Sequence, residues 1–211
     1  DPPAFEFLSM GYQVFILESS CAEQAGECRP LRELARAVCE LRRRCGAWRI
    51  DPAKIAVLGF SAGGHLAASL GALWNDPRLA LPPESRPDAL VLCYPVIATM
   101  GEFAHPESAR WVSGGDEAVR EALHLWDRVT PDFPPAFLWH GGGDESVPPE
   151  NSLRLAAELR RCGVPFEYHL FEGGAHGIST CTREVETPDP ECRAWVPLCR
   201  AWLNRRFSYT P

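Results

Sequence analysis

The sequence predicts one α/β domain with a mostly parallel sheet that is covered by helices on both faces. Short apolar runs alternate with longer amphipathic stretches along the 211 residues. That alternation is typical of parallel strands joined by right-handed helical crossovers. The sequence contains no long Ser/Gly run, charge block, low-complexity tract or internal repeat that would mark a linker. A single domain of this length can bury a sizeable core, so we expect residues 1–211 to fold as one unit.

The first half of the chain is expected to hold two strands, each followed by a helix. The apolar run YQVFIL at 12–17 predicts a buried strand. Apolar residues then recur at helical spacing over 31–45, and Gly46 supplies a stop. KIAVLGF at 54–60 predicts the second strand, and an Ala/Leu-rich helix follows over 62–73.

The second half predicts three strands, two helices and one insertion. The strands are expected at 89–95, 136–140 and 166–171, and the helices at 149–162 and about 192–207. The stretch at about 96–135 is long for a connection, and we expect a cap-like insertion that roofs a cleft with Trp111 and Trp126. Because Trp is strongly buried on average, packing is the commoner role for these two side chains.

Composition excludes several classes of function. The net charge of −7 argues against nucleic acid or an anionic membrane as the main partner, and no apolar run approaches a membrane-spanning length. None of the nine cysteines forms a C-x-x-C pair, so no zinc knuckle or thioredoxin-like site is expected. Cys21 and Cys28 flank a polar loop and would pair only in an oxidising compartment. We expect no metal or cofactor and a cytoplasmic location, although the sequence begins at Asp1 and any signal peptide would precede it.

The strand at 54–60 runs directly into a G-x-S-x-G motif, Gly59-Phe60-Ser61-Ala62-Gly63. A serine in this turn stands at the tip of a strained backbone, and the glycines on either side remove side chains that would collide there. The N–H groups at the start of the following helix then point at a developing oxyanion. The alternative is a serine in an ordinary strand–helix turn. The apolar strand before it and the Ala-rich helix after it favour the nucleophile.

The strand at 136–140 is followed by HGGGDES, in which Asp144 is the candidate acid. A carboxylate at this place would orient a catalytic histidine and support its charge. The alternatives are a turn Asp that caps the helix at 149, and the adjacent Glu145. His-Gly-Gly-Gly also spells the oxyanion loop of lipases, but that loop precedes the nucleophile, whereas this string follows Ser61. We therefore interpret the three glycines as the turn that presents Asp144.

His176 lies after the strand at 166–171, in the loop EGGAHG. Small neighbours suit a loop from which an imidazole projects into a cleft, and a serine nucleophile needs such a base. The alternative is a polar loop histidine. The chain order Ser61, Asp144, His176 places each residue after a different strand, in the order nucleophile, acid, base. The remaining histidines have weaker positions: His65, His105, His124, His140 and His169.

Together these motifs resemble a known family. GFSAGGHLAASL, LVLCYPV, HGGGDESVP and FEGGAHGI are similar to the small bacterial α/β-hydrolase esterases of the acetyl-xylan-esterase and BD-FAE type, near the prolyl-oligopeptidase and dienelactone-hydrolase groups. The resemblance covers nearly the whole chain and implies an α/β-hydrolase fold. It implies Ser61 as nucleophile, Asp144 as acid, His176 as base and the Ala62 N–H as one oxyanion donor. It also implies short acyl esters as substrates, often acetyl groups on sugars.

The chain departs from the family at two places. Relatives carry strands before the one at 12–17 and a Gly-rich loop that supplies a second oxyanion N–H, and residues 1–10 offer neither. We expect an N-terminally incomplete chain that is weakly active and marginally stable, because losing one oxyanion donor costs roughly 10²–10³ in kcat. About 60 residues upstream would complete a typical domain. The second departure is Glu18-Ser19, where relatives tend to place an aromatic residue before the serine, and it affects the expected acyl pocket.

Two other functions are compatible with the same residues. A peptidase of the prolyl-oligopeptidase type would use the same triad order, although no propeller domain is visible in the sequence. A catalytically impaired binding module on the same fold would keep the fold without turnover. Substrate profiling separates the first from an esterase, and labelling of Ser61 by a fluorophosphonate separates the second.

Overall fold

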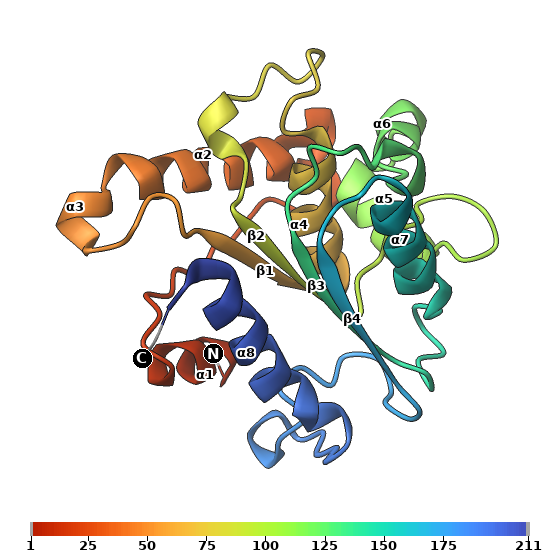
Figure 1. Cartoon of the computed structure of the whole chain (residues 1–211). Helices are drawn as coiled ribbons and strands as arrows, with labels where there is room; N and C mark the ends of the chain where they lie inside the picture. The colour runs from red at the N-terminus through yellow and green to blue at the C-terminus, as the bar shows by residue number, and fades with distance from the viewer. Residues whose placement is uncertain (1, 210–211) are drawn as a thin grey trace.

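The molecule is built on a four-stranded parallel sheet. The structure is a computed structural model that describes residues 2–209. Its strands are β1 (Ala56–Phe60), β2 (Ala89–Cys93), β3 (Ala136–Gly141) and β4 (Phe166–Phe171), in the spatial order β1-β2-β3-β4 (Figure 1). Every neighbouring pair is parallel, and the register runs without interruption through each strand. The carboxyl ends of all four strands therefore meet at one edge, where parallel sheets place their ligands.

One face of the sheet is covered by three helices. They are α2 (Arg29–Arg43), α4 (Ser61–Leu73) and α7 (Glu150–Arg161), and their apolar sides pack with Leu90 and Leu92 of β2 in one core cluster. In a strand, alternate side chains point to opposite faces, so Leu90 and Leu92 lie on the same face. α4 follows β1 at once, which fixes its start at the carboxyl edge of the sheet.

The opposite face is covered by the two ends of the chain. α1 (Pro2–Ser9) and α8 (Trp195–Phe207) lie side by side beneath the sheet in Figure 1. Their apolar residues pack with Val91 of β2 and Trp139 of β3, and the Trp139 indole stacks on Trp195 at 5.4 Å between ring centroids. Helices on both faces explain why β2 and β3 are continuous apolar runs. The prediction of a parallel α/β sheet with two covered faces is confirmed.

The prediction of a strand at 12–17 is wrong. This segment is extended but belongs to no strand, and Phe15, Ile16 and Leu17 are 46%, 64% and 40% exposed. Its composition suits a buried strand, but a strand also needs a neighbour that completes its hydrogen-bond ladder. No strand in the described chain pairs with it. β1 lies at one edge of the sheet, and β2 is its one neighbouring strand among the described residues.

The helix expected over 31–45 ends earlier than its apolar pattern suggests. α2 stops at Arg43, and a separate turn of helix, α3 (Cys45–Trp48), begins after Arg44. Gly46 lies inside α3, so its expected role as the stop is wrong. The left-handed residue that ends α3 is Arg49, with φ of +55°.

The stretch over 96–135 packs onto the carboxyl edge of the sheet. Val96–Ala98 are buried, and α5 (Pro106–Ser113) and α6 (Glu117–Ala122) follow. Asp116 caps α6 by accepting hydrogen bonds from the Ala118 and Val119 N–H groups. Side-chain caps of this kind hold short helices that have few turns of their own.

Six short 3₁₀ turns lie between the helices and strands of the described chain. Two 3₁₀ turns before α2 are η1 (Ala22–Gln24) and η2 (Gly26–Cys28), and four more are η3 (Pro83–Ser85), η4 (Trp126–Arg128), η5 (Arg183–Val185) and η6 (Cys192–Ala194). All nine cysteines are free thiols, so Cys21 and Cys28 are not paired in this structure. Among residues 2–209, no helix combines the length and apolar character required to cross a membrane.

Candidate active site

Ser61 stands on a sharp turn between β1 and α4. β1 ends at Phe60 and α4 begins at Ser61, whose φ of +51° is unfavourable for a residue with a side chain. A Cβ atom added at Gly59 would collide with the carbonyl oxygen of Gly63, and one at Gly64 would lie 2.9 Å from the Pro95 Cβ. Gly59 and Gly64 are therefore required by close approach, whereas a Cβ atom at Gly63 would meet nothing within 4 Å. The strained turn presents the Ser61 side chain at the carboxyl edge of the sheet.

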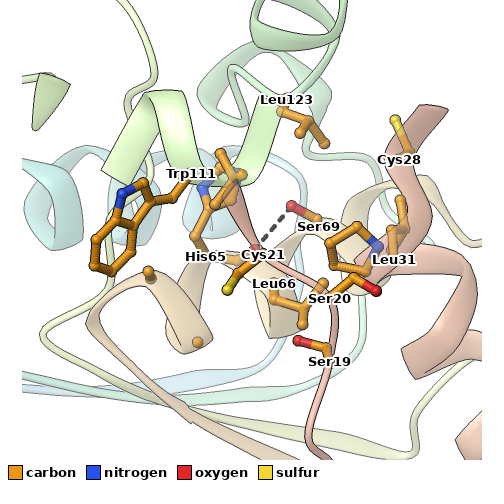
Figure 2. Close-up of a pocket in the computed structure, with 14 residues that line it drawn as sticks. Ser19, Ser20, Cys21, Cys28, Leu31, His65, Leu66, Ser69, Trp111 and Leu123 are labelled. Atoms are coloured by element: carbon orange, nitrogen blue, oxygen red, sulfur yellow. Dashed lines mark hydrogen bonds between the residues drawn. The ribbon is translucent and has the colours of Figure 1, made fainter. Parts of the chain in front are cut away.

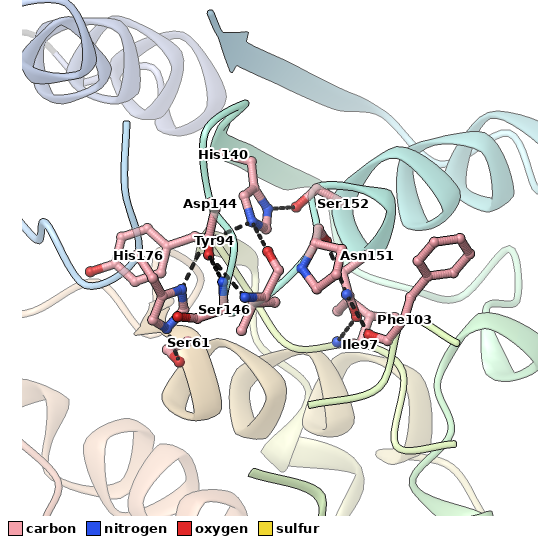
Figure 3. A network of polar contacts seen from close by, with 12 residues as sticks. Ser61, Tyr94, Ile97, Phe103, His140, Asp144, Ser146, Asn151, Ser152 and His176 are labelled. Carbon is pink, nitrogen blue, oxygen red and sulfur yellow. Dashed lines mark hydrogen bonds and ion pairs between the residues drawn. The ribbon is translucent and has the colours of Figure 1, made fainter. Parts of the chain in front are cut away.

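The structure brings Ser61, His176 and Asp144 into one hydrogen-bonded line (Figure 3). The Ser61 Oγ lies 2.8 Å from His176 Nε2, and His176 Nδ1 lies 2.7 Å from Asp144 Oδ2. An ionised carboxylate only accepts, so Nδ1 carries the ring proton and Nε2 accepts from the serine hydroxyl. This tautomer is the one in which the imidazole takes a proton from serine.

Asp144 is fixed by its own turn rather than by a helix. Its side chain is completely buried, and its Oδ1 accepts hydrogen bonds from the N–H groups of Ser146 and Val147 at 3.0 and 2.9 Å. Burial by itself raises the pKa of Asp144, but hydrogen bonds from His140, His176 and Val147 outweigh it and hold the pKa well below its usual range. Pro149, not Asp144, precedes the first residue of α7, so the cap alternative is wrong. Glu145 points into solvent.

His140 is a part of the site that the sequence analysis did not identify. Its ring is fully buried, and Nε2 lies 3.0 Å from the Val147 carbonyl and 3.3 Å from Asp144 Oδ2. Nδ1 lies 2.7 Å from the Ser152 hydroxyl of α7. Because the carbonyl and the carboxylate only accept, Nε2 is the protonated nitrogen and Nδ1 accepts from Ser152. The available signal was the spacing in HGGGD, which puts a histidine four residues before the acid at the end of a buried strand.

The glycines of HGGG bring two loops together. Added Cβ atoms at Gly141 and Gly142 would collide with carbonyl oxygens of the loop 171–174, which precedes His176. The Gly142 N–H donates to the Phe171 carbonyl at 2.8 Å. The prediction that these glycines shape the turn at Asp144 is thus extended by a second role. They allow the loop that holds Asp144 and the loop that precedes His176 to pack backbone against backbone. This packing brings Asp144 Oδ2 within 2.7 Å of His176 Nδ1.

Tyr94 supports the other side of His176. Its ring meets the imidazole edge to face at 5.1 Å between centroids, and its hydroxyl accepts a hydrogen bond from the Ser179 N–H at 2.9 Å. Burial raises the pKa of this phenol, so it stays neutral. Tyr94 has a positive φ of +35° directly after β2. The sequence prediction places it inside the strand at 89–95, where nothing in the apolar run distinguishes it.

Ala62 is the second residue of α4, and its N–H is one of the first four that a helix leaves without an intrahelical partner. A pocket of about 210 Å³ opens beside it, between α4, the segment 19–21 and α5 (Figure 2). Ser19 and Ser20 both line this pocket, and Ser20 also donates two hydrogen bonds of 2.7 Å to the Glu33 carboxylate. The departure at Glu18-Ser19 therefore lies at the pocket wall.

The two tryptophans of the insertion have different environments. Trp111 is 47% exposed and lines the pocket beside Ala62. Trp126 packs between Phe103 and Arg154, with the Arg154 guanidinium 4.5 Å from its ring centroid. The remaining histidines do not reach the Ser61 hydroxyl. The most deeply buried of them, His65, bonds the Val96 carbonyl through Nδ1 at 3.0 Å.

The fold and the site define the class of protein. A parallel sheet with two covered faces carries a serine on a strained strand–helix turn, with a histidine and a buried carboxylate from the next loops, in the α/β-hydrolase arrangement. Residues 46–189 match the prolyl oligopeptidase family, and the chain belongs to it. The resemblance to α/β-hydrolase esterases is confirmed by the solved structures that this chain is similar to.

Two solved structures illustrate the similarity. The acetyl ester-xyloside bifunctional hydrolase from Caldicellulosiruptor lactoaceticus is 35% identical, with a TM-score of 0.85 over 100% of this chain and 77% of that chain. A sugar hydrolase from Lactococcus lactis is 32% identical, with a TM-score of 0.84 over 99% of this chain and 82% of that chain.

Curated relatives are longer than this chain. Endo-1,4-beta-xylanase B of Butyrivibrio fibrisolvens is 33% identical over 190 residues, which are 86% of this chain and 30% of the xylanase. The acetylxylan esterase of Xylanibacter ruminicola is 26% identical over 145 residues, which are 65% of this chain and 28% of the esterase. The chain thus spans less than a third of the length of these two relatives.

Proposed function

We propose that this chain is a serine ester hydrolase in which Ser61 is the nucleophile, His176 the general base and Asp144 the acid. The observation that carries the proposal is the hydrogen-bonded line from Ser61 Oγ through His176 to Asp144. The three residues come from three different strand ends, so the sheet itself fixes their spacing. A serine bound only to water or to its own backbone would offer no such path for its proton.

The reaction follows from these contacts. His176 Nε2 takes the Ser61 proton while Ser61 Oγ attacks the ester carbonyl, and Asp144 stabilises the imidazolium that results. The Ala62 N–H donates to the oxyanion of the tetrahedral intermediate. His176 then gives its proton to the leaving alcohol, and a water that His176 activates hydrolyses the acyl-enzyme. The low pKa of Asp144 keeps the carboxylate charged throughout the cycle.

Short acyl esters, among them acetyl groups on carbohydrates, are the proposed substrates. The names of the relatives support this class, because one is an acetylxylan esterase and another an acetyl ester-xyloside hydrolase. The net charge of −7 suits a neutral ester better than a polyanionic substrate.

The test is hydrolysis of p-nitrophenyl acetate and of acetylated xylo-oligosaccharides by the chain and by Ser61→Ala. We expect the substitution to lower kcat/KM by at least about 10⁴-fold, because removal of a triad nucleophile leaves only residual stabilisation. Ser9→Ala, which changes an exposed serine on α1, is the matched control and should keep the full rate. Equal turnover by the Ser61 variant would reject the assignment.

A peptidase is the second candidate, and the family match favours it. Esters and proline-containing peptides would use the same three residues, so the two activities are distinguished by rate. Parallel kcat/KM values for p-nitrophenyl acetate and a Gly-Pro p-nitroanilide decide between them. We expect the ester to be preferred by at least 100-fold, roughly the difference that about 3 kcal/mol makes in a rate.

We propose in addition that turnover is slow, because Ala62 is the one oxyanion donor that the motifs identify. Loss of one of two donors costs roughly 10²–10³ in kcat. Side-by-side assays with the Caldicellulosiruptor lactoaceticus hydrolase should show a difference of this size. Stoichiometric labelling of Ser61 by a fluorophosphonate, together with slow turnover, would support an intact nucleophile with an incomplete oxyanion site. Absence of labelling would favour the binding-module alternative.

A further inference from the structure

We call the apolar pocket of about 210 Å³ beside Ala62 the channel. Ala62, Leu66 and Ser69 of α4 line it, and Leu66 and Ser69 are labelled in Figure 2. The seven helical steps from Ala62 to Ser69 span about 10 Å. Leu31 near the start of α2, Trp111 of α5 and Leu123 after α6 also line it. The channel therefore begins beside Ala62, the residue that follows the proposed nucleophile, and extends along α4 to Ser69.

The wall of the channel is apolar and uncharged. Its surface is mostly apolar, with Leu31, Leu66, Val112 and Leu123 among the side chains that line it, and no Asp, Glu, Lys or Arg lines it. The polar side chains deep in the channel are occupied or neutral. Ser69 donates its hydroxyl to the His65 carbonyl at 2.8 Å, and burial lowers the pKa of His65 to about 4, so the ring carries no charge near neutral pH. Such a wall favours a hydrocarbon ligand over a sugar.

The site geometry decides which half of an ester enters the channel. The leaving alcohol must lie within hydrogen-bond reach of His176 Nε2, from which it takes its proton. None of the residues that line the channel belongs to the His176 loop or to the Asp144 loop. The oxyanion faces the Ala62 N–H at the channel mouth. The acyl chain is the third group on the carbonyl carbon, and it is the group left to enter the channel.

We propose that this channel is the acyl-binding pocket and that it prefers unbranched apolar acyl chains of about six carbons to acetyl. The inference rests on the proposed ester hydrolysis and extends its acyl range. A methyl or methylene group needs about the space of a water molecule, roughly 30 Å³. The 210 Å³ of the channel therefore accommodate several such groups, whereas an acetyl group fills only its mouth.

The test is the chain-length profile of kcat/KM for p-nitrophenyl acetate, butyrate, hexanoate and dodecanoate. Each buried methylene should raise kcat/KM by about fourfold until the channel is full. We expect a rise from acetate to hexanoate and a fall at dodecanoate. A profile that is flat or falls from acetate onwards would overturn the proposal.

Leu66→Trp tests the location of the acyl chain. A larger side chain halfway along α4 should fill the channel, lowering hexanoate turnover at least tenfold while acetate turnover stays within about threefold. Leu153→Trp is the matched control, because Leu153 is 44% exposed on α7, away from the channel. Val112→Ala should shift the optimum towards longer chains. This second variant keeps the proposal testable if Leu66→Trp fails to fold, which its thermal unfolding curve will show.

The outcomes separate the two proposals. Acetate turnover and Ser61 labelling with a flat chain-length profile would overturn the acyl channel alone. A rise towards hexanoate that Leu66→Trp leaves unchanged would place the chain elsewhere and also overturn it. Absence of both labelling and turnover on every ester would overturn the proposed function and this inference with it.

Discussion

His140 and Asp144 form the most deeply buried polar pair of the site. Both side chains are completely inaccessible, and each is held by a residue outside the pair, Ser152 on one side and His176 on the other. A buried network in which every member is bonded fixes side-chain orientation tightly. The position of the His176 imidazole therefore depends on residues beyond its own loop.

The substitution His140→Leu should change both the pKa and the position of the Asp144 carboxylate. The substitution removes one donor to the carboxylate, and a lost hydrogen bond to a charged group costs about 1.5–3 kcal/mol, or roughly 10–100-fold in kcat if fully expressed in the transition state. The pKa of Asp144 should rise towards its usual range, which carbon NMR of its side-chain carboxyl measures directly. His140→Gln, which keeps an N–H donor, should recover part of the rate.

Glu145→Gln is the control for this experiment. It removes a carboxylate next to Asp144 that points into solvent, so kcat and its pH dependence should stay unchanged. A side-chain titration of Asp144 that is the same in His140→Leu and in the native chain would show that His140 has no influence on the pKa of Asp144.

His65 makes the folded state sensitive to acid. Burial lowers its pKa from 6.5 to about 4, so between these pH values the unfolded chain binds a proton that the native chain does not. The contribution of His65 is fully present above pH 6.5 and is lost as pH falls towards 4. At about 1.4 kcal/mol per pKa unit, the free energy of unfolding should decrease by about 3 kcal/mol over this window.

Urea unfolding at pH 7.5, 6.0, 5.0 and 4.5 measures this decrease. The slope should be much smaller in His65→Gln, and the difference between the two proteins isolates His65 from the carboxylates. His105→Asn is the matched control, since asparagine also caps α5 and the substitution removes a histidine at the surface of the insertion. Identical slopes in the native chain and His65→Gln would contradict the prediction.

At the scale of elements, the two loops after β3 and β4 work as a unit. Their backbones touch at Gly141 and Gly142, and this contact sets the distance between the acid and the base. Gly142→Ala should push the loops apart, lengthen the Asp144–His176 bond and lower kcat by at least tenfold. Small shifts in a triad have effects of this size because the reacting groups lose their alignment.

Gly173→Ala is the counterpart on the facing loop. A Cβ atom at Gly173 meets nothing within 4 Å, and its φ is not in the left-handed region, so the rate should stay near that of the native chain. Comparing kcat for the two alanine variants separates loop spacing from a general effect of alanine. Equal rates would indicate that the loop contact does not position the triad.

The elements that the sequence predicts well are those with local causes. β2 and β3 are apolar runs because both faces of the sheet are buried there, and all four strands lie within two residues of their expected places. Ser61, Asp144 and His176 are recognisable because each follows such a run. His140 and Tyr94 are not, because their roles depend on bonds to Ser152 and Ser179 that no local pattern contains.

At the scale of the whole molecule, the segment at 12–17 shows that the sequence alone does not predict which segments pair as strands. Its residues are as apolar as those of a core strand. A strand forms only when a second segment pairs with it, and no described strand pairs with this one. Tyr12 and Val14 still pack against the cluster beneath the sheet, while the apolar side chains of Phe15, Ile16 and Leu17 face solvent. β1 also has a free edge among the described residues.

Exposed apolar residues beside an open sheet edge favour association between copies. We expect this chain to associate reversibly at micromolar concentration, and Ile16→Lys to shift it towards the monomer. Ile16 is the most exposed of the three side chains, at 64%, so lysine should cost the fold little while its charge opposes pairing. Sedimentation velocity at several concentrations measures the shift. Leu170→Lys is the control, because Leu170 is 45% exposed on β4, at the opposite edge of the sheet. If both variants change association equally, the effect comes from added charge, and the 15–17 segment is not the contact surface.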